Sequence, residues 1–173
     1  MKRTIFFDVD NTLVCREKNV MCDYTIKAIK MCKNNGINVA IATGRSLAMV
    51  KQENFYNMFN TIVSANGALI TVNNKVIYKK CMDRKIVQDM VKYFECNNIP
   101  YCLHLLDRSI GKIENNWVRS FSEKYNMKID KLEDEVLSNI YDYEVFQLNA
   151  KINSNDIDKL KKKYDKLSKI YYI

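Results

Sequence analysis

The sequence predicts an α/β protein built on a parallel sheet, followed by a smaller unit that mixes strands and helices. Over the first 64 residues or so, strand-like and helix-like segments alternate as β-α-β-α-β. Helical crossovers of this kind join parallel strands with right-handed connections. After residue 68 the order changes to a hairpin followed by helices and strands in turn. A chain of 173 residues has room for one ordinary domain or two small ones.

The elements of the first half follow from periodicity and end signals. Residues 4–9 are apolar, β-branched and aromatic, which indicates a buried strand. Apolar residues recur at steps of three along residues 24–35, and Gly36 follows as a C-cap, which is typical of a helix. The remaining elements are a strand at 37–42, a helix from Ser46 to about Met58 and a strand at 61–64.

The second half begins with a hairpin. Residues 68–72 and 75–79 flank Asn73-Asn74, a pair that suits a tight turn. The domain boundary is expected between Ala68 and Met82, with units at 1–72 and 73–173. The further expected elements are a helix at 83–97, a strand at 101–106, a helix bearing Trp117, Phe121 and Tyr125 on one stripe, a strand near 145–152, a helix at 154–164 and a strand at 168–173.

Charge and cysteine content favour no specialised partner. The 28 basic and 20 acidic residues give a net charge of +8, but the charge is spread out. Its densest run, residues 159–163, fits the solvated face of a helix, so no nucleic-acid partner is expected. None of the six cysteines forms a C-x-x-C pair and His104 is the single histidine, which argues against a zinc site.

The sequence favours neither a membrane span nor a signal peptide. Its apolar runs stop short of the ~20 residues that a membrane span needs. The first residues lack the apolar stretch and cleavage site of a signal peptide. We therefore expect a cytoplasmic protein without a membrane partner.

Two aspartates, Asp8 and Asp10, stand where the first strand ends. Ligands bind at the carboxyl ends of the strands in open α/β sheets. If the strand ends between the two residues, one carboxylate can attack while the other handles protons, and both can hold Mg²⁺. The alternative is a turn or capping cluster, because Asp-Asn-Thr suits both.

The next two strands also end in residues suited to ligand binding. Thr43-Gly44-Arg45 follows the second strand and opens a helix, so a hydroxyl, a close backbone approach, amide donors and a guanidinium form a phosphate site. Asn66-Gly67 follows the third strand. Three consecutive strands therefore deliver polar or glycine-bearing ends to one edge of the sheet.

Together, residues 8–13 (DVDNTL), 43–45 (TGR) and 66–68 (NGA) resemble the haloacid dehalogenase (HAD) superfamily, and specifically its Cof-type, subfamily IIB phosphatases. The resemblance is close over the first 70 residues and looser afterwards. It implies a HAD-like Rossmannoid parallel sheet, here the N-terminal half of the core, plus an α+β cap domain of type C2.

The resemblance also implies Mg²⁺-dependent hydrolysis of a small phosphorylated metabolite through an aspartyl-phosphate. Asp8 would be the nucleophile and, with its other oxygen, a metal ligand. Asp10 would be the general acid and base and would bind the metal with its backbone carbonyl. Asn11 replaces the common glycine, and asparagine tolerates left-handed backbone geometry. The implied phosphate-binding residues are Asn11, Thr43, Gly44 and Arg45, with Asn66 and Gly67 in the substrate pocket.

One departure from the family pattern concerns the later motifs. Nothing after residue 80 matches the family's lysine and its Gly-Asp-x-x-Asn-Asp-like motif. We therefore expect residues 1–173 to comprise half a core plus a cap, with weak activity. A non-catalytic phosphate-binding remnant is the alternative. The first strand's edge would be open to self-association or to a completing chain. His104, on an apolar strand, is expected to be structural.

Overall fold

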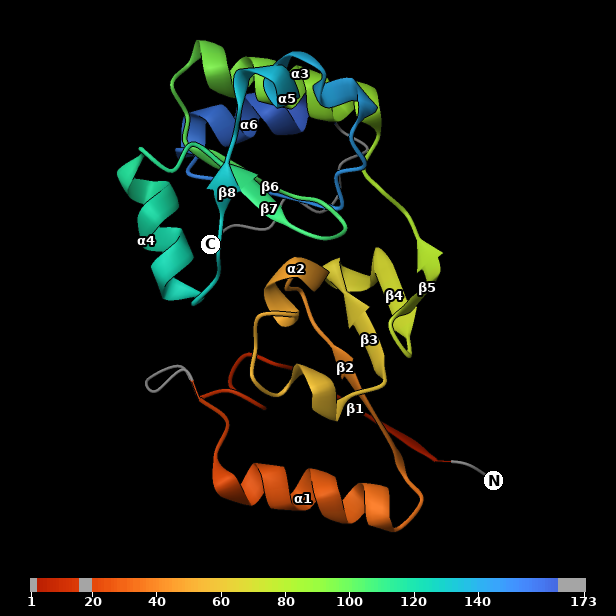
Figure 1. The fold of residues 1–173 in the computed structure, drawn as a ribbon. Helices are drawn as coiled ribbons and strands as arrows, with labels where there is room; N and C mark the ends of the chain where they lie inside the picture. The colour runs from red at the N-terminus through yellow and green to blue at the C-terminus, as the bar shows by residue number, and fades with distance from the viewer. Residues whose placement is uncertain (1–2, 16–19, 165–173) are drawn as a thin grey trace.

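The computed structural model describes residues 3–15 and 20–164. They form two units, which Figure 1 shows one above the other. The first contains a five-stranded sheet and the second a four-stranded sheet with helices around it. This arrangement confirms the predicted combination of an α/β sheet with an α+β unit.

The first sheet has the strand order β1-β2-β3-β4-β5. Strands β1 (Thr4–Phe7), β2 (Asn38–Ala42) and β3 (Thr61–Ser64) run parallel. Strands β4 (Leu69–Val72) and β5 (Lys75–Lys79) are antiparallel to their neighbours. The three parallel strands therefore bring their carboxyl ends to one edge, as the sequence predicted.

Helix α1 (Asp23–Asn34) connects β1 to β2, and Gly36 with φ +70° follows it as predicted. The long helix expected from Ser46 to Met58 is wrong. Helix α2 comprises only Leu47–Val50, although Ser46 does cap it by accepting from the Met49 amide at 3.3 Å. Turns and the short η1 (Tyr56–Met58) follow, and they allow Phe55 to pack into the core.

The prediction of a buried first strand is also wrong. Strand β1 lies at the sheet edge and pairs only with β2. Ile5 is 37% exposed and Phe6 57% exposed because nothing in the described residues pairs with the outer side of this strand. The strand ends at Phe7 and not between Asp8 and Asp10 as predicted, so both aspartates follow the strand.

The hairpin between β4 and β5 confirms its prediction. Asn73 and Asn74 have φ values of 48° and 63°, the two left-handed positions that a tight hairpin turn of this kind requires. Strand β5, inside the range expected for the second unit, pairs with the first sheet. A short η2 (Ala65–Gly67) links β3 to β4 and begins the loop that follows the third parallel strand.

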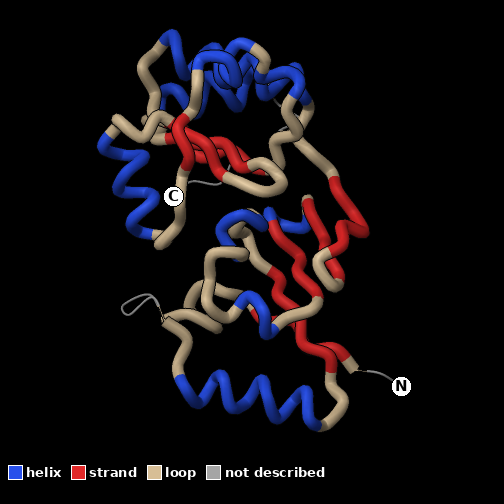
Figure 2. Tube along the Cα trace, in the orientation of Figure 1, coloured by secondary structure: helices blue, strands red, loops and turns tan. Residues whose placement is uncertain are grey.

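The second unit places helices and a sheet in two layers, which Figure 2 separates by colour. Its strand order is β8-β7-β6-β9. The sequence missed β8 and α5, and the strand expected at 168–173 lies outside the described residues. Its elements are α3 (Arg84–Cys96), β6 (Tyr101–His104), β7 (Ser109–Gly111), α4 (Asn116–Lys124), β8 (Asp130–Lys131), α5 (Asp134–Ser138), η3 (Ile140–Asp142), β9 (Gln147–Ala150) and α6 (Ser154–Lys163).

The aromatic stripe on α4 packs, as predicted. The ring centroids of Trp117 and Phe121 are 5.2 Å apart, and those of Phe121 and Tyr125 are 4.8 Å apart. Phe121 joins a cluster with Cys102 of β6, which closes one face of the second sheet. The basic run at 159–163 lies in α6, where Leu160 is buried and the lysines are exposed, as expected of a solvated face.

Each unit inserts one apolar side chain into a core cluster of the other. Phe146, just before β9, belongs to the core cluster of the first unit. Met49 of α2 belongs to the cluster under α4 in the second. The backbone amide of Lys128 also donates to Gln52 Oε1 at 2.5 Å. The segment containing α2 therefore lies between the two units (Figure 1).

In the described ranges, no helix combines the length and the apolar character needed to cross a bilayer. The six cysteines are all free thiols.

Candidate active site

The loop after β2 is bonded to the loop after β3 at the carboxyl edge of the sheet. The Thr43 amide donates to Val63 O at 2.9 Å, and the Asn66 amide donates to Thr43 O at 3.2 Å. The Ala65 amide donates to Arg45 O at 2.8 Å. These bonds place Thr43 and Asn66 side by side, although 23 positions separate them in the sequence.

Gly44 stands where the Asn66 side chain comes closest to the loop. A Cβ built at Gly44 would lie 3.1 Å from Asn66 Oδ1. Such a contact is tighter than most, so a side chain at position 44 would displace the amide. Gly67, with φ +88°, and Asn66, with φ 55°, occupy left-handed geometry, which lets the chain reverse direction after β3.

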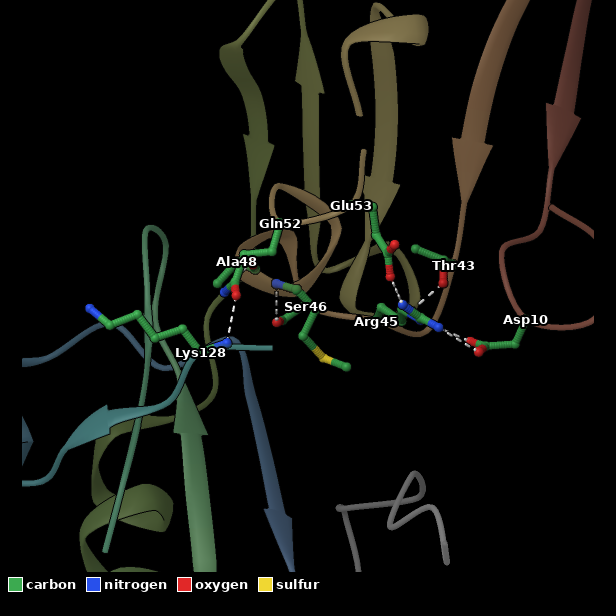
Figure 3. Close-up of polar contacts among 9 residues, drawn as sticks. Asp10, Thr43, Arg45, Ser46, Ala48, Gln52, Glu53 and Lys128 are labelled. Carbon is green, nitrogen blue, oxygen red and sulfur yellow. Dashed lines mark hydrogen bonds and ion pairs between the residues drawn. The ribbon is translucent and has the colours of Figure 1, made fainter. Parts of the chain in front are cut away.

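The turn after β1 carries Asp10 back toward this loop. The amides of Leu13 and Val14 both donate to Val9 O, at 3.0 and 2.9 Å. Asn11 has φ 63°, the left-handed geometry predicted for it. The Asp10 carboxylate lies beside the loop that contains Arg45 (Figure 3).

Arg45 is the charged centre of the site. Its Nε donates to Asp10 Oδ2 at 3.2 Å, and its Nη2 donates to Asp10 Oδ1 at 2.9 Å. Its Nη1 donates to Glu53 Oε1 from the opposite side (Figure 3). The side chains of Arg45 and Glu53 are only 5% and 8% exposed, whereas that of Asp10 is 37% exposed. The guanidinium thus lies between a buried carboxylate and one that reaches solvent.

The ionisation of Arg45 follows from these two neighbours. Burial by itself would lower the pKa of the guanidinium. The hydrogen bonds and negative charges of Asp10 and Glu53 outweigh this effect and raise the pKa. Arg45 therefore stays charged while it is buried.

Asp8 differs from Asp10 in its surroundings. It is the first residue after β1, and its side chain is exposed. It forms no hydrogen bond or ion pair with the residues that the structure describes. The exposed Asp8 side chain can therefore be approached by a ligand from solvent.

Thr43 keeps its hydroxyl proton available. Thr43 Oγ1 accepts a hydrogen bond from the Arg45 amide at 3.1 Å, and the side chain is 6% exposed. A hydroxyl that accepts one bond can still donate another. Thr43 is therefore placed to donate to an anion at the strand ends.

The residues present suit a magnesium ion. Mg²⁺ is usually held by one or two carboxylates together with waters and substrate phosphates. Asp8 offers a carboxylate that has no partner in the part of the chain that the structure describes, and Asp10 offers oxygen ligands although its carboxylate accepts from Arg45. Within the ranges 3–15 and 20–164, no cluster of three or more His, Cys, Asp or Glu side chains is suited to holding a metal. The ion would be held by Asp8, Asp10, water and the phosphate of a bound substrate.

Glu53 and Tyr125 are two members of the site that sequence reasoning missed. Glu53 falls in the segment predicted to be helical, and the aromatic stripe predicts only a packing role for Tyr125. The Tyr125 ring lies with its centroid 5.7 Å from Arg45 Cζ. Glu53 reaches Arg45 only because the chain leaves α2 after Val50, and Tyr125 comes from the second unit, so no periodic pattern points to either contact.

His104 is buried and fully bonded at the boundary of the two units. Its Nδ1 lies 2.7 Å from Ser109 Oγ and 3.3 Å from Ser46 Oγ, and its Nε2 lies 2.8 Å from Asn149 Oδ1. Because Asn149 Oδ1 only accepts, we assign the ring proton to Nε2. Burial lowers the pKa of His104 to about 4, so the ring is neutral at pH 7. The expectation of a structural histidine agrees with these contacts.

Comparison with known proteins agrees with this geometry. The sequence model of the haloacid dehalogenase-like hydrolases matches residues 5–172. The chain is 31% identical over 90 residues to YkrA of Bacillus subtilis, which is named as a phosphatase. The matched residues are 52% of this chain and 35% of YkrA.

Two solved structures are similar in fold. The HAD subclass IIB sugar phosphatase BT4131 superposes with a TM-score of 0.76 and 25% identity, over 93% of this chain and 63% of that one. A Geobacillus kaustophilus protein superposes with a TM-score of 0.81 and 20% identity, over 95% and 63%. The chain thus matches about a third of YkrA and less than two thirds of the solved proteins. The match to residues 5–172, together with the site at the strand ends, shows that the chain belongs to the haloacid dehalogenase-like hydrolase family.

Proposed function

We propose that the site hydrolyses the phosphate ester of a small metabolite, such as a sugar phosphate or a nucleotide, with Asp8 as the nucleophile. The observation that carries the proposal is the contrast between the two aspartates. Asp8 is exposed and unpaired with the described residues, whereas Asp10 is held by Arg45 beside Thr43. The likeness to the sugar phosphatase BT4131 supports the substrate class.

In the first step an oxygen of Asp8 attacks phosphorus, and the bond from phosphorus to the leaving alkoxide breaks. A carboxylate is a competent covalent nucleophile in such reactions. Asp10, after taking up a proton from solvent on the oxygen released by Arg45, supplies the proton that the alkoxide takes up. In the second step water attacks the phosphorus of the aspartyl-phosphate, Asp10 takes the proton of the water, and the bond to Asp8 breaks to release phosphate.

Thr43, Gly44 and a bound Mg²⁺ would assist this reaction. The Thr43 hydroxyl donates to an equatorial oxygen of the phosphoryl group, and Gly44 keeps the backbone free to approach it. Fixed donors directed at the developing charge contribute most to phosphoryl transfer. Mg²⁺ bound by Asp8 and Asp10 would neutralise and orient the phosphate.

The test is phosphate release from p-nitrophenyl phosphate by the full chain, with Mg²⁺ and with EDTA. We expect release that requires Mg²⁺ and is lost in Asp8→Asn, a change that keeps the size of the side chain. Asp107→Asn, in the exposed turn between β6 and β7, is the matched control and should behave as the unmodified protein. Equal release by the Asp8 and Asp107 variants would reject Asp8 as the nucleophile.

One observation favours a second candidate, a phosphate-binding remnant without turnover. Both oxygens of Asp10 accept from Arg45, and no group of three metal-ligating residues occurs among the described residues. A remnant of this kind would bind inorganic phosphate in calorimetry but release none from the ester, and Thr43→Val would abolish the binding.

The partners of the chain are proposed on the same grounds. The edge of β1, with exposed Ile5 and Phe6, is suited to pair with a strand of a second copy or of a completing chain. The absence of nucleic-acid and membrane partners and the cytoplasmic location stay predictions.

A further inference from the structure

We propose that Glu53 is a positioning residue that sets the place of the Asp10 carboxylate through Arg45, and that Tyr125 from the second unit holds the same guanidinium from its face. The inference rests on the proposed function only for its effect on the rate. The arrangement of the four side chains is independent of it.

The guanidinium of Arg45 links Glu53 to Asp10. An arginine side chain is a planar fork, so a partner that fixes one edge also orients the other. Glu53 engages Nη1, while Nε and Nη2 face Asp10 at 3.2 and 2.9 Å. A movement of Glu53 therefore rotates or shifts the pair of donors that hold Asp10.

The three charged side chains differ in burial. Glu53 and Arg45 are 8% and 5% exposed, so their pair lies away from water. A charge pair in such surroundings is weakly screened and costly to break by removing one partner. Asp10, at 37% exposed, is the member that can move. The cluster is thus anchored at Glu53 and free at Asp10.

The second unit contacts the same guanidinium through Tyr125. The Tyr125 ring centroid lies 5.7 Å from Arg45 Cζ, within reach of a cation–π contact. Tyr125 follows α4 and packs on Phe121, so its ring is held by the second unit. The position of the second unit therefore affects the orientation of Arg45 and, through Arg45, that of the Asp10 carboxylate.

The chemical consequence concerns proton delivery. Both oxygens of Asp10 accept from Arg45, so one of them must be released and take up a proton from solvent before Asp10 can give a proton to a leaving group. Glu53 retains the guanidinium while this happens, because it balances the charge of Arg45 from the buried side. Loss of its charge should slow the chemical step and leave substrate binding almost unchanged.

The first experiment needs no activity. The Arg45 Nε–H resonance is followed by ¹H–¹⁵N NMR in the full chain and in Asp10→Asn, Glu53→Gln, Glu53→Asp and Tyr125→Leu. Glu144→Gln is the matched control, because Glu144 pairs with Lys79 at the surface. Urea unfolding of Asp10→Asn, Glu53→Gln and their combination gives a double-mutant cycle, since coupled residues depart from additivity.

We expect Glu53→Gln and Tyr125→Leu to shift the Arg45 resonance, and Glu53→Asp to restore it in part. The changes in urea midpoint caused by Asp10→Asn and Glu53→Gln should not be additive in the double variant. The changes caused by Asp10→Asn and Glu144→Gln should be additive. An Arg45 resonance unmoved by Glu53→Gln, or additive midpoints for that pair, would overturn the proposal whether or not the chain is active.

The second experiment tests the rate. With p-nitrophenyl phosphate and Mg²⁺, Glu53→Gln should lower kcat on the order of 10- to 100-fold with little change in KM, because a misplacement of ~1 Å can cost ~10² in rate. Glu53→Asp should recover part of the loss. An unchanged kcat, or a loss confined to KM, would contradict the positioning role. An inactive unmodified chain rejects the proposed function instead, and the resonance and the cycle still decide the coupling.

Discussion

The backbone at Gly44 lies so close to the Asn66 side chain that a Cβ at position 44 would stand 3.1 Å from Asn66 Oδ1. The two residues follow neighbouring parallel strands, β2 and β3. Their contact therefore depends on the register of the sheet, and it fixes where the loop of Thr43 ends and that of Asn66 begins.

Gly44→Ala is expected to displace the Asn66 amide and to disturb the phosphate site more than the fold. Stability should fall by about 1 kcal/mol, as is common for point changes. Affinity for inorganic phosphate should fall several-fold in calorimetry. Gly36→Ala, after α1 and away from the site, is the control for stability alone: it strains a left-handed position with φ +70° but should leave phosphate affinity unchanged. Equal phosphate affinity of Gly44→Ala and the unmodified chain would reject the close approach as a binding requirement.

Arg45→Gln should be one of the more destabilising single changes in the first unit. It leaves Glu53, which is 8% exposed, without its cation. Removing one partner of a buried pair costs about 3 kcal/mol or more. Urea unfolding followed by circular dichroism measures the loss, with Arg119→Gln on the exposed face of α4 as the control. A loss no larger than that of the control would show that the pair contributes nothing to stability.

His104 should make the folded state sensitive to acid. Burial lowers its pKa from 6.5 to about 4 in the folded state. Between these values the histidine is protonated in the unfolded chain and neutral in the folded chain. The contribution of His104 to the free energy of unfolding is therefore fully present above pH 6.5 and is lost as the pH drops toward 4.

The slope from this histidine is at most about 1.4 kcal/mol per pH unit. Urea unfolding at several pH values should show a shallower decline for His104→Asn than for the unmodified chain. The other titrating groups are common to both proteins, so the difference isolates His104. Parallel curves would mean that the histidine is not held neutral.

The exposed edge of β1 should promote association. Phe6→Lys places a charge on a side chain that is 57% exposed, and charged residues block edge pairing. Light scattering after size exclusion should therefore show a lower average mass for this variant. Tyr24→Lys, on a residue of α1 that is 74% exposed, is the control for added charge. If the unmodified chain is already a monomer at all concentrations, the edge does not mediate association.

Much of the fold could be predicted because its signals are local. The hairpin at Asn73-Asn74, the C-cap at Gly36 and the N-cap at Ser46 each depend on neighbouring residues, and the structure confirms all three. The length of α2 depends on something else. The chain leaves the helix after Val50, and Glu53 turns toward Arg45 while Phe55 packs into the core.

The site was predictable only in part, for the same reason. Strand ends in order along the chain point to Asp8, Thr43 and Asn66. The pairing of Arg45 with Asp10 spans 35 positions, and the Tyr125 contact comes from the second unit. Such contacts depend on how whole elements are placed, and sequence periodicity carries no information about that.

Because Phe146 and Met49 each pack in the core of the opposite unit, separating the two units costs free energy. Each side chain is at most 5% exposed where it lies, so opening would transfer both to water at ~1.5–3 kcal/mol per side chain. A closed molecule is therefore the resting form. A ligand too large to reach Thr43 from the solvent side has to supply this energy from its own contacts, so ligand size filters access before any chemistry begins.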